Sequence, residues 1–500
     1  MMYSSCQSIP CGESIPVKNP HAVSVSLPTI QDVVRYEEGA WEVVEKMKSG
    51  YPRFFRNHWV QQLVAVVCEK FSVSKEYLVF PLPSKKAYEV LCSLVSCELK
   101  QVTFEGLPFV LVRQNDPVIP QIKGYIQNAG LIVSSRQAEY CLYKLGLLPV
   151  LFEEKRFEFS KALYTIDDVL TKAYAVREEE VVLTCNGANA IFAVCEGILS
   201  KTYKGKKKKQ LVQLGWLYLD TMEVIRKRAT NAHVFLDVFD LDAFEVYIKE
   251  NHEQIAAVVS EFVSNPKIEC LDVERVYKIC KEHEVLLVLD VTLITPFNSP
   301  VMDFCDVAVE SLSKFACGHA DVLMGVIVCK DAQLLSQITA FVIPPFSGEI
   351  ERLGYEIVGY KERVQKISKQ TKQLIAFLSK SPRVSKVMSV TVGKSKEVYQ
   401  RHAKSFDIPG LVSVVFDSKL STYYDGLPLF KGPSLGAEFT LTMPYVYLAH
   451  YDLMQTTEGR AYLEVNNIDT ELLRISVGLE PIEEIIEAFE KVFENEILEI

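Results

Sequence analysis

The chain is organised around residues 305–325, CDVAVESLSKFACGHADVLMG. This stretch predicts two apolar strands joined by a small polar turn. Lys314 lies between the strands, one and three residues after the hydroxyls of Ser313 and Ser311. A partly desolvated lysine has a lowered pKa and suits Schiff-base formation, and hydroxyl groups bind phosphate through hydrogen bonds. The pattern therefore predicts a site for pyridoxal 5'-phosphate (PLP), although most lysines of a protein lie on its surface.

PLP also requires an acid that faces its pyridine nitrogen. Residues 285–289 are a continuous apolar run that ends in Asp290, which predicts a buried parallel strand with the carboxylate at its carboxyl end. Ligands of open α/β sheets bind at that end. A helix N-cap is the alternative for Asp290 alone, but its combination with Lys314 favours a cofactor site.

Two motifs resemble those of a known family. They are Asp290-Val291-Thr292 with Pro296, and Ser311-Leu312-Ser313-Lys314 with Gly318-His319. Both are similar to the core motifs of the Cys/Met-metabolism PLP-dependent enzymes, which include cystathionine γ-synthase, cystathionine γ-lyase and methionine γ-lyase. The resemblance implies the type I fold of PLP-dependent transferases and places Thr292, Ser311 and Ser313 beside the cofactor.

The composition is that of an ordinary globular protein, with 49% apolar and 24% charged residues. A net charge of −10 argues against nucleic acid or an anionic membrane as a partner. No apolar run is long enough to span a membrane, and the N-terminus shows no secretory signal. The 13 cysteines form no CxxC pair and the eight histidines show no HxH or HxxxH spacing. We therefore expect reduced thiols, a cytoplasmic location and no metal site.

Strand and helix patterns alternate from residue 181 to residue 314, which predicts an α/β protein with a mostly parallel, doubly wound sheet covered by helices on both faces. The resemblance implies a sheet of the seven-stranded type. Because 500 residues exceed one ordinary core, we expect three parts. These are an N-terminal extension (1–145), a PLP-binding large domain (146–370) and a smaller α+β C-terminal substrate domain (371–500).

The first 145 residues lie outside what ordinary bacterial family members carry. They resemble the N-terminal extension of fungal-type cystathionine γ-synthases at HAVSVSLPT (21–29), GYPRFF (50–55) and SSRQAEYCL (134–142). Residues 1–20 are rich in Ser, Pro and Gly and are predicted to be loose. We hypothesise that the extension replaces the family's Tyr-x-Arg arm, which is not obvious in this chain, and covers the mouth of the active site.

Several residues are candidates for cofactor contacts. Gly187 and Ala188 follow a predicted strand at residues 181–184 and begin a helix, where backbone amides can meet an anion; a tight turn without a ligand is the alternative. The resemblance implies that this turn holds the phosphate. It also implies that Tyr218 stacks on the pyridine ring and that Asn265, in EFVSNP, contacts the ring hydroxyl.

The chain departs from the family pattern in three places. Asn186-Gly187-Ala188 stands in place of Ser-Gly-Met, and Val291 replaces an asparagine of many bacterial relatives. The Tyr-x-Arg motif, which in the family reaches into the neighbouring subunit's phosphate site, is not obvious. Arg136 is predicted as its substitute in cofactor binding, with Lys161 behind it, and surface charge is the alternative for both. Such changes are expected to alter substrate choice or weaken cofactor affinity.

The candidate substrate-binding residues lie in the C-terminal part of the chain. Arg474 lies in LRISVGLE (473–480), which resembles the family's carboxylate-binding motif, and a planar guanidinium binds a carboxylate bidentately. Ser434 lies in a segment that resembles the second-domain substrate loop. The resemblance implies that Lys314 transfers protons, Asp290 keeps the pyridine nitrogen protonated and Tyr218 completes the catalytic set. The expected reaction is that of cystathionine γ-synthase: O-acylhomoserine and cysteine give cystathionine, in methionine biosynthesis by transsulfuration.

Two alternatives stay open at this point. A cystathionine or methionine γ-lyase shares Lys314, Asp290 and Tyr218, so these residues do not distinguish it from a synthase. A non-catalytic homologue on the same fold is the second alternative. The acyl group of the homoserine ester is also open. The resemblance implies amino-acid substrates and a homodimer or homotetramer with active sites shared between subunits.

Overall fold

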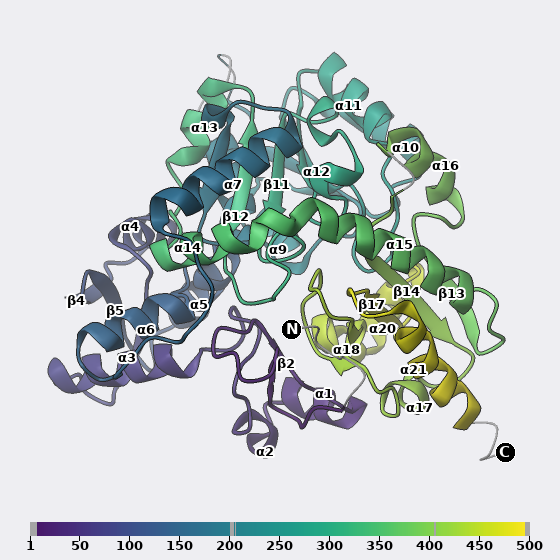
Figure 1. Cartoon of the computed structure of the whole chain (residues 1–500). Coiled ribbons are helices and arrows are strands. Elements are labelled where there is room, and N and C mark those ends of the chain that lie inside the picture. The colour runs from purple at the N-terminus through teal and green to yellow at the C-terminus, as the bar shows by residue number, and fades with distance from the viewer. Residues whose placement is uncertain (1–7, 201–204, 206, 405–406, 496–500) are drawn as a thin grey trace.

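The computed structural model describes residues 8–200, 205, 207–404 and 407–495 (Figure 1). Its strands form a seven-stranded, a five-stranded and a three-stranded sheet, together with a two-stranded pair near the N-terminus. None of the helices within the described ranges combines the length and the apolar character that crossing a membrane requires. The three larger sheets fall within the three predicted parts of the chain, whose boundaries stay predictions.

The seven-stranded sheet confirms the predicted α/β fold. Its spatial order is β6-β12-β11-β10-β9-β7-β8, and only β12 runs antiparallel to its neighbours. The strands are β6 (Val181–Thr184), β7 (Gln210–Leu214), β8 (His233–Phe235), β9 (Ile255–Glu261), β10 (Leu286–Asp290), β11 (Val307–Ser311) and β12 (Gly325–Cys329).

Helices cover both faces of this sheet because alternate strand residues point to opposite sides. On β10, Leu287 and Leu289 belong to one apolar core, and Leu286 and Val288 belong to the other. The first core also contains residues of α7 (Phe159–Tyr174), α10 (Leu241–Asn251), α11 (Val273–Glu282) and α14 (Ser347–Glu356). The second contains residues of α8 (Gly187–Ser200), α9 (Leu219–Arg228) and α13 (Ala332–Thr339).

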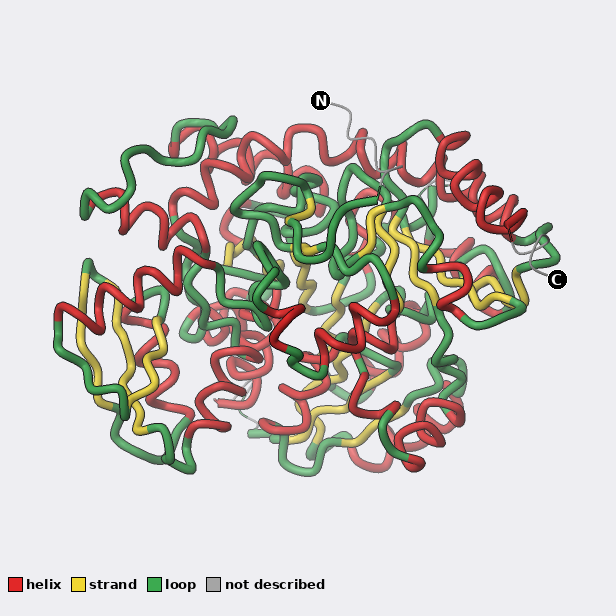
Figure 2. The backbone as a smooth tube through the Cα atoms, turned by 90° about the horizontal axis from the view of Figure 1, so that it is seen from below, coloured by secondary structure: helices red, strands yellow, loops and turns green. Residues whose placement is uncertain are grey.

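The three-stranded sheet lies at one end of the molecule, as Figure 2 shows. Its order is β3-β5-β4, all antiparallel. Phe109 packs on one side in a small separate core, whereas Val110 packs on the other side in the core of the large domain. The elements of this region are α3 (His58–Lys70), β3 (Tyr77–Pro81), α4 (Lys85–Leu94), β4 (Lys100–Phe104), β5 (Leu107–Arg113), α5 (Ile119–Asn128) and α6 (Ser135–Lys144).

The C-terminal part is built on the five-stranded sheet β13-β14-β17-β16-β15. Its strands are β13 (Val384–Met388), β14 (Leu411–Phe416), β15 (Phe430–Lys431), β16 (Leu441–Pro444) and β17 (Leu473–Ser476). α15 (Tyr360–Leu378) runs across the predicted boundary at residue 370 and packs against α21 (Ile482–Asn495). The sequence predicts a closing amphipathic helix over residues 481–498, of which residues 496–498 lie outside the described ranges.

The N-terminal segment packs against the C-terminal part (Figure 1). β1 (Ser14–Ile15) pairs with β2 (Ser24–Val25), and α1 (Ile30–Glu37) packs against α18 (Tyr445–Ala449). The prediction that residues 1–20 are loose is wrong for residues 8–20, because Ile15 is completely buried; residues 1–7 lie outside the described ranges. Local composition does not reveal contacts with residues hundreds of positions away.

Candidate active site

A cavity of about 870 Å³ opens at the carboxyl ends of β9, β10 and β11. All three parts of the chain contribute to its wall, with Tyr51 from the extension, Lys314 from the large domain and Arg474 from the C-terminal part. The carboxyl end of a parallel sheet is where the chain can bring several strand-end side chains together. Of the predicted site residues, all except Arg136 line this cavity.

Lys314 lies deep in the cavity and is 8% exposed. Its Nζ lies 2.9 Å from Ser434 Oγ and 3.1 Å from the hydroxyl of Tyr51. Burial lowers the pKa of Lys314, and the nearby Tyr51 offsets part of that effect. No carboxylate of the described chain forms a salt bridge with Lys314, so its amine is suited to covalent attachment of a cofactor and to proton transfer.

Asp290 ends β10 and faces the same cavity. Its Oδ1 accepts a hydrogen bond of 2.9 Å from the amide of Thr292, and the Thr292 hydroxyl oxygen accepts one of 2.9 Å from the amide of Ser311. Burial raises the pKa of Asp290, although the bonds from Thr292 oppose the effect. A half-buried carboxylate in this position gains from a cationic partner such as a protonated pyridine nitrogen.

The turn before α8 is suited to bind a phosphate. The backbone of Gly187 lies so close to Ser311 that a Cβ at position 187 would be 2.8 Å from Ser311 Cβ. Asn186 Oδ1 accepts from the amide of Asn189 at 2.9 Å and thereby caps the helix, whose first amides at Gly187 and Ala188 line the cavity. Ser313 also lines the cavity, and its Oγ accepts from the Met324 amide at 3.2 Å.

Glu261 positions two of the predicted cofactor contacts. Its Oε1 accepts from the amide of Tyr218 at 2.6 Å, and its Oε2 accepts from the amide of Asn265 at 3.1 Å. Burial raises the pKa of Glu261 well above its usual range, and the neighbouring Asp290 adds to the effect. Glu261 is a residue that the sequence analysis did not single out, although it opens the EFVSNP motif.

Arg474 is 4% exposed and lies on the C-terminal side of the cavity. Its Nη1 donates to Asn265 Oδ1 at 3.3 Å and its Nη2 donates to the carbonyl of Ser434 at 2.5 Å. Its Nε is buried and has no hydrogen-bond partner among the described residues. Burial lowers the pKa of Arg474 to about 10. The guanidinium therefore remains charged at neutral pH and has a donor left for a substrate carboxylate.

A Tyr-x-Arg motif is present at Tyr51-Pro52-Arg53, so the expectation that the chain lacks an obvious one is wrong. Besides the contact of Tyr51 with Lys314, Arg53 forms a buried salt bridge with Asp220 and contacts the hydroxyl of Tyr218. The guanidinium carbon of Arg53 lies 4.8 Å from the centroid of the Tyr218 ring. The signal was present in the GYPRFF segment, where a tyrosine precedes an arginine by two positions.

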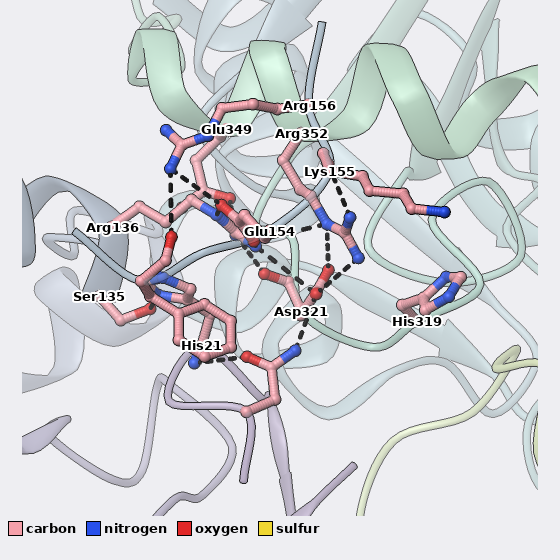
Figure 3. Close-up of polar contacts among 12 residues, drawn as sticks. His21, Ser135, Arg136, Glu154, Lys155, Arg156, His319, Asp321, Glu349 and Arg352 are labelled. Carbon is pink, nitrogen blue, oxygen red and sulfur yellow. Dashed lines mark hydrogen bonds and ion pairs between the residues drawn. The ribbon is translucent and has the colours of Figure 1, made fainter. Parts of the chain in front are cut away.

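Arg136, the predicted substitute for this motif, lies elsewhere (Figure 3). Its guanidinium binds both carboxylate oxygens of Glu154 at 2.8 and 2.7 Å, Glu349 Oε2 at 2.9 Å and the carbonyl of Asp321. Arg352 completes the buried cluster by pairing with Asp321 at 3.0 Å. Arg136 is therefore saturated with contacts inside its own chain, and the structure does not bring it to the cavity.

The residues of the cavity fit PLP. One space is surrounded by a buried lysine, a half-buried carboxylate without a salt bridge among the described residues, a helix start beside two serines, and an aromatic ring. The close approach of Gly187 and Ser311 leaves room there only because residue 187 has no side chain. Lys314 would attach the cofactor, Asp290 would face its ring nitrogen, and Gly187, Ala188, Ser311 and Ser313 would hold its phosphate.

Comparisons with known proteins identify the family of the chain. A family model described as Cys/Met metabolism PLP-dependent enzyme matches residues 152–494. The chain is 33% identical, over 95% of its length and 96% of the relative, to an L-2-amino-4-chloropent-4-enoate dechlorinase/desaturase of Streptantibioticus cattleyicolor. It is 27% identical to a cystathionine γ-synthase of Neurospora crassa, with 96% of this chain and 97% of that protein covered.

A solved structure supports the fold. The crystal structure of cystathionine γ-synthase from Xanthomonas oryzae pv. oryzae in complex with aminoacrylate and cysteine superposes with a TM-score of 0.59 at 19% identity. The superposition covers 71% of this chain and 94% of that one. With the family model, the fold and the cavity in agreement, the chain belongs to the Cys/Met-metabolism family of PLP-dependent enzymes.

Proposed function

We propose that the chain catalyses a γ-replacement of the cystathionine γ-synthase type. The acyl group of an O-acylhomoserine would be exchanged for the sulfur of cysteine, which gives cystathionine for methionine biosynthesis. The observation that carries the proposal is the position of Lys314, which lies buried between Tyr51 and Ser434 in a cavity that Asp290 and Arg474 also line. Two cystathionine γ-synthases, of Neurospora crassa and Saccharomyces cerevisiae, align with 96% and 97% of the chain, including the extension.

Each residue has a definite task in this reaction. Arg474 binds the substrate carboxylate through its two-pronged guanidinium, and thereby fixes Cα near Lys314. Lys314, whose lowered pKa favours the neutral amine, accepts the proton from Cα, and it removes and later returns a proton at Cβ, while the γ-substituent at Cγ is exchanged. Ser434 and Tyr51 hold Nζ in place, and Asp290 holds the proton on the ring nitrogen. When bound, PLP supplies the electron sink that makes these proton transfers feasible.

The extension takes part in the same site under this proposal. Tyr51 and Arg53 come from it, and Tyr36, Glu37 and Phe54 also line the cavity. This arrangement supports the hypothesis that the extension covers the mouth of the active site. We also propose a cytoplasmic enzyme that forms a homodimer or homotetramer, which light scattering of the purified protein would test.

A second candidate is a γ-elimination without an added nucleophile. It is favoured by the 33% identity to the dechlorinase/desaturase, whose name describes loss of chlorine from an amino acid. A γ-lyase belongs to the same class of reaction. The residues described above would serve either outcome, because both begin with loss of the Cα proton and of the γ-substituent.

Product analysis distinguishes these candidates. The purified protein with PLP is incubated with O-acetylhomoserine or O-succinylhomoserine, with and without cysteine. Cystathionine that depends on cysteine supports the synthase, whereas 2-oxobutanoate or an unsaturated amino acid supports elimination. Lys314→Ala should lose both the visible absorbance of the bound cofactor and all turnover, while Lys172→Ala, at an exposed lysine paired with Asp168, should keep both. Unchanged turnover in Lys314→Ala would overturn the proposal.

A further inference from the structure

One wall of the cavity differs in chemistry from the cofactor side. It is apolar and aromatic, and its side chains come from the loop after β7, from β16 and from the helices that follow. They are Trp216, Met443, Tyr445, His450 and Tyr462. Arg474 adjoins this wall, since its guanidinium carbon lies 5.6 Å from the centroid of the Tyr445 ring. A substrate whose carboxylate is bound by Arg474 therefore has this wall within reach of its side chain.

His450 is the polar exception in the wall. It is 7% exposed, and its ring centroid lies 5.1 Å from that of Trp216 and 5.7 Å from that of Tyr445. Its Nε2 is buried and has no hydrogen-bond partner among the described residues. Burial lowers the pKa of His450 to about 4, so the ring is neutral at pH 7 and has one donor and one acceptor. Buried polar atoms are rarely left unsatisfied, which indicates a ligand at this point.

The charges of the cavity restrict what that ligand can be. The described arginines and lysines in its lining are Arg53, Lys314 and Arg474. Arg53 is paired with Asp220, and the other two serve the cofactor and the substrate carboxylate. Six carboxyl groups line the same cavity: Glu37, Glu223, Glu261, Asp290, Glu310 and Asp452. Burial raises the pKa of Glu261 and Glu310, so these two carboxyl groups contribute little negative charge. An anionic substituent would still find no unpaired cation in the described lining to bind it.

We propose that this wall is the pocket for the γ-substituent, that it accepts an uncharged group such as an acetyl ester or a halogen, and that His450 donates one hydrogen bond to that group. The inference rests on the proposed function, because it assigns the substrate class for the same site. Succinyl and phosphoryl esters of homoserine, which carry a further negative charge, are excluded as preferred substrates.

The role of His450 is consistent with the chemistry of the leaving group. When the bond between Cγ and oxygen breaks, acetate departs with the electron pair, and the electrons left at Cβ by proton removal complete the new bond to Cγ. Acetate needs no proton to leave, so His450 stays neutral. Its hydrogen bond becomes stronger as negative charge develops on the departing oxygen. His450 is accordingly a substrate-binding residue of this pocket.

The first test compares esters. We expect kcat/KM of the wild-type enzyme for O-acetylhomoserine to exceed the values for O-succinylhomoserine and O-phosphohomoserine by at least about tenfold, given that an unpaired charge must be desolvated. His450→Leu should lower kcat/KM for O-acetylhomoserine by about 5- to 15-fold, the effect of one hydrogen bond. His450→Gln keeps a donor and should restore most of the loss. Preference for an anionic ester, or a His450→Leu enzyme with unchanged kcat/KM, would overturn the inference.

A second test does not depend on turnover. L-glutamine and L-glutamate have nearly the same shape but differ in the charge of the side chain. Each is titrated into the PLP-loaded protein, and the change in cofactor absorbance is followed. We expect half-saturation with L-glutamine at a concentration at least about tenfold lower than with L-glutamate. In His450→Leu, the part of this preference that comes from the hydrogen bond of His450 should be lost, and only the part that comes from the charge of L-glutamate should remain. If no ester reacts but L-glutamine is preferred, the proposed function fails and the assignment of an uncharged pocket stands. Tighter binding of L-glutamate refutes the assignment itself.

Discussion

The buried charge cluster around Arg136 predicts that replacing this arginine destabilises the protein. Arg136 makes two hydrogen bonds to Glu154, one to Glu349 Oε2 at 2.9 Å and one to the carbonyl of Asp321 (Figure 3). After Arg136→Met, Arg352 still forms salt bridges with Asp321 at 3.0 Å and with Glu154 at 3.6 Å. Glu349 keeps the amide of Leu323, at 3.1 Å, and a hydrogen bond with the side chain of Ser134, both of which are neutral partners. One buried carboxylate therefore loses its salt-bridge partner.

Removing one member of a buried ion pair costs about 3–5 kcal/mol of unfolding free energy. We expect Arg136→Met to lose this amount at pH 7.5, measured by urea denaturation followed by tryptophan fluorescence. Burial raises the pKa of Glu349 and Arg136 lowers it, so the substitution raises that pKa further. A carboxyl whose pKa is higher in the folded state than in the unfolded state destabilises the protein as pH rises between the two values. The loss of unfolding free energy caused by Arg136→Met should therefore be smaller when the measurement is repeated at pH 5.5.

Arg226→Met is the matched control. Arg226 is 67% exposed and pairs with Glu223 at 2.7 Å, and loss of such a surface pair costs less than about 1 kcal/mol. If Arg136→Met is as stable as this control but binds PLP more weakly, Arg136 acts as a cofactor ligand, as the resemblance first suggested, and the reasoning from the cluster fails. The outcome thus separates a structural role from a direct one.

Three further substitutions test the site and the core beneath it. Asp290→Asn should lower kcat by roughly 10²–10⁴-fold, because the amide cannot hold the proton on the ring nitrogen, and steady-state kinetics with normal rates would exclude that role. Arg474→Lys should lower kcat/KM by about 10- to 150-fold, mainly through KM, since a single-point ammonium replaces two-pronged binding; an unchanged KM would place the carboxylate elsewhere. Glu310 is buried between the hydroxyls of Tyr174 and Tyr360, and burial raises its pKa to about 7. Glu310→Gln should therefore stabilise the protein at pH 8 by about 3 kcal/mol and much less at pH 5, and equal stabilisation at both pH values would contradict the assigned ionisation.

The elements of the large domain could be predicted from the sequence because their signals are local. β10 is a continuous apolar run that ends in Asp290, and β11 opens with the apolar residues 307–309 and ends in Ser311, so each strand ends in a polar group. Such buried parallel strands have a continuous apolar pattern that few other structures share. The same reasoning located Lys314 correctly between two strands of the sheet.

The contacts of the extension could not be predicted in this way. Tyr51 and Arg53 lie in a short irregular segment, where the Tyr-x-Arg spacing is the one local signal. That spacing does not show that the two side chains contact Lys314 and Tyr218, which follow them by 263 and 165 positions. Arg136 was favoured instead because it lies just upstream of the large domain. The pairing of Arg136 with Glu349 joins residues 213 positions apart, so its role depends on tertiary structure alone.

The contact between the N-terminal segment and the C-terminal part has a consequence for the order of events during synthesis. Three hydrogen bonds join these parts. The hydroxyl of Ser24 donates to the carbonyl of Pro433, 409 positions later. The carbonyls of Leu27 and Pro28 accept from the side chains of Tyr424 and Lys431, which follow them by 397 and 403 positions. At about 5–20 residues per second, a ribosome needs roughly 20–80 s to supply these partners. Residues 24–28 are thus among the last to pack although they are made early. Tyr51 and Arg53 belong to the same extension. In a nascent chain that has already folded its large domain, this segment would therefore lack its partners until residues 424–433 have been made.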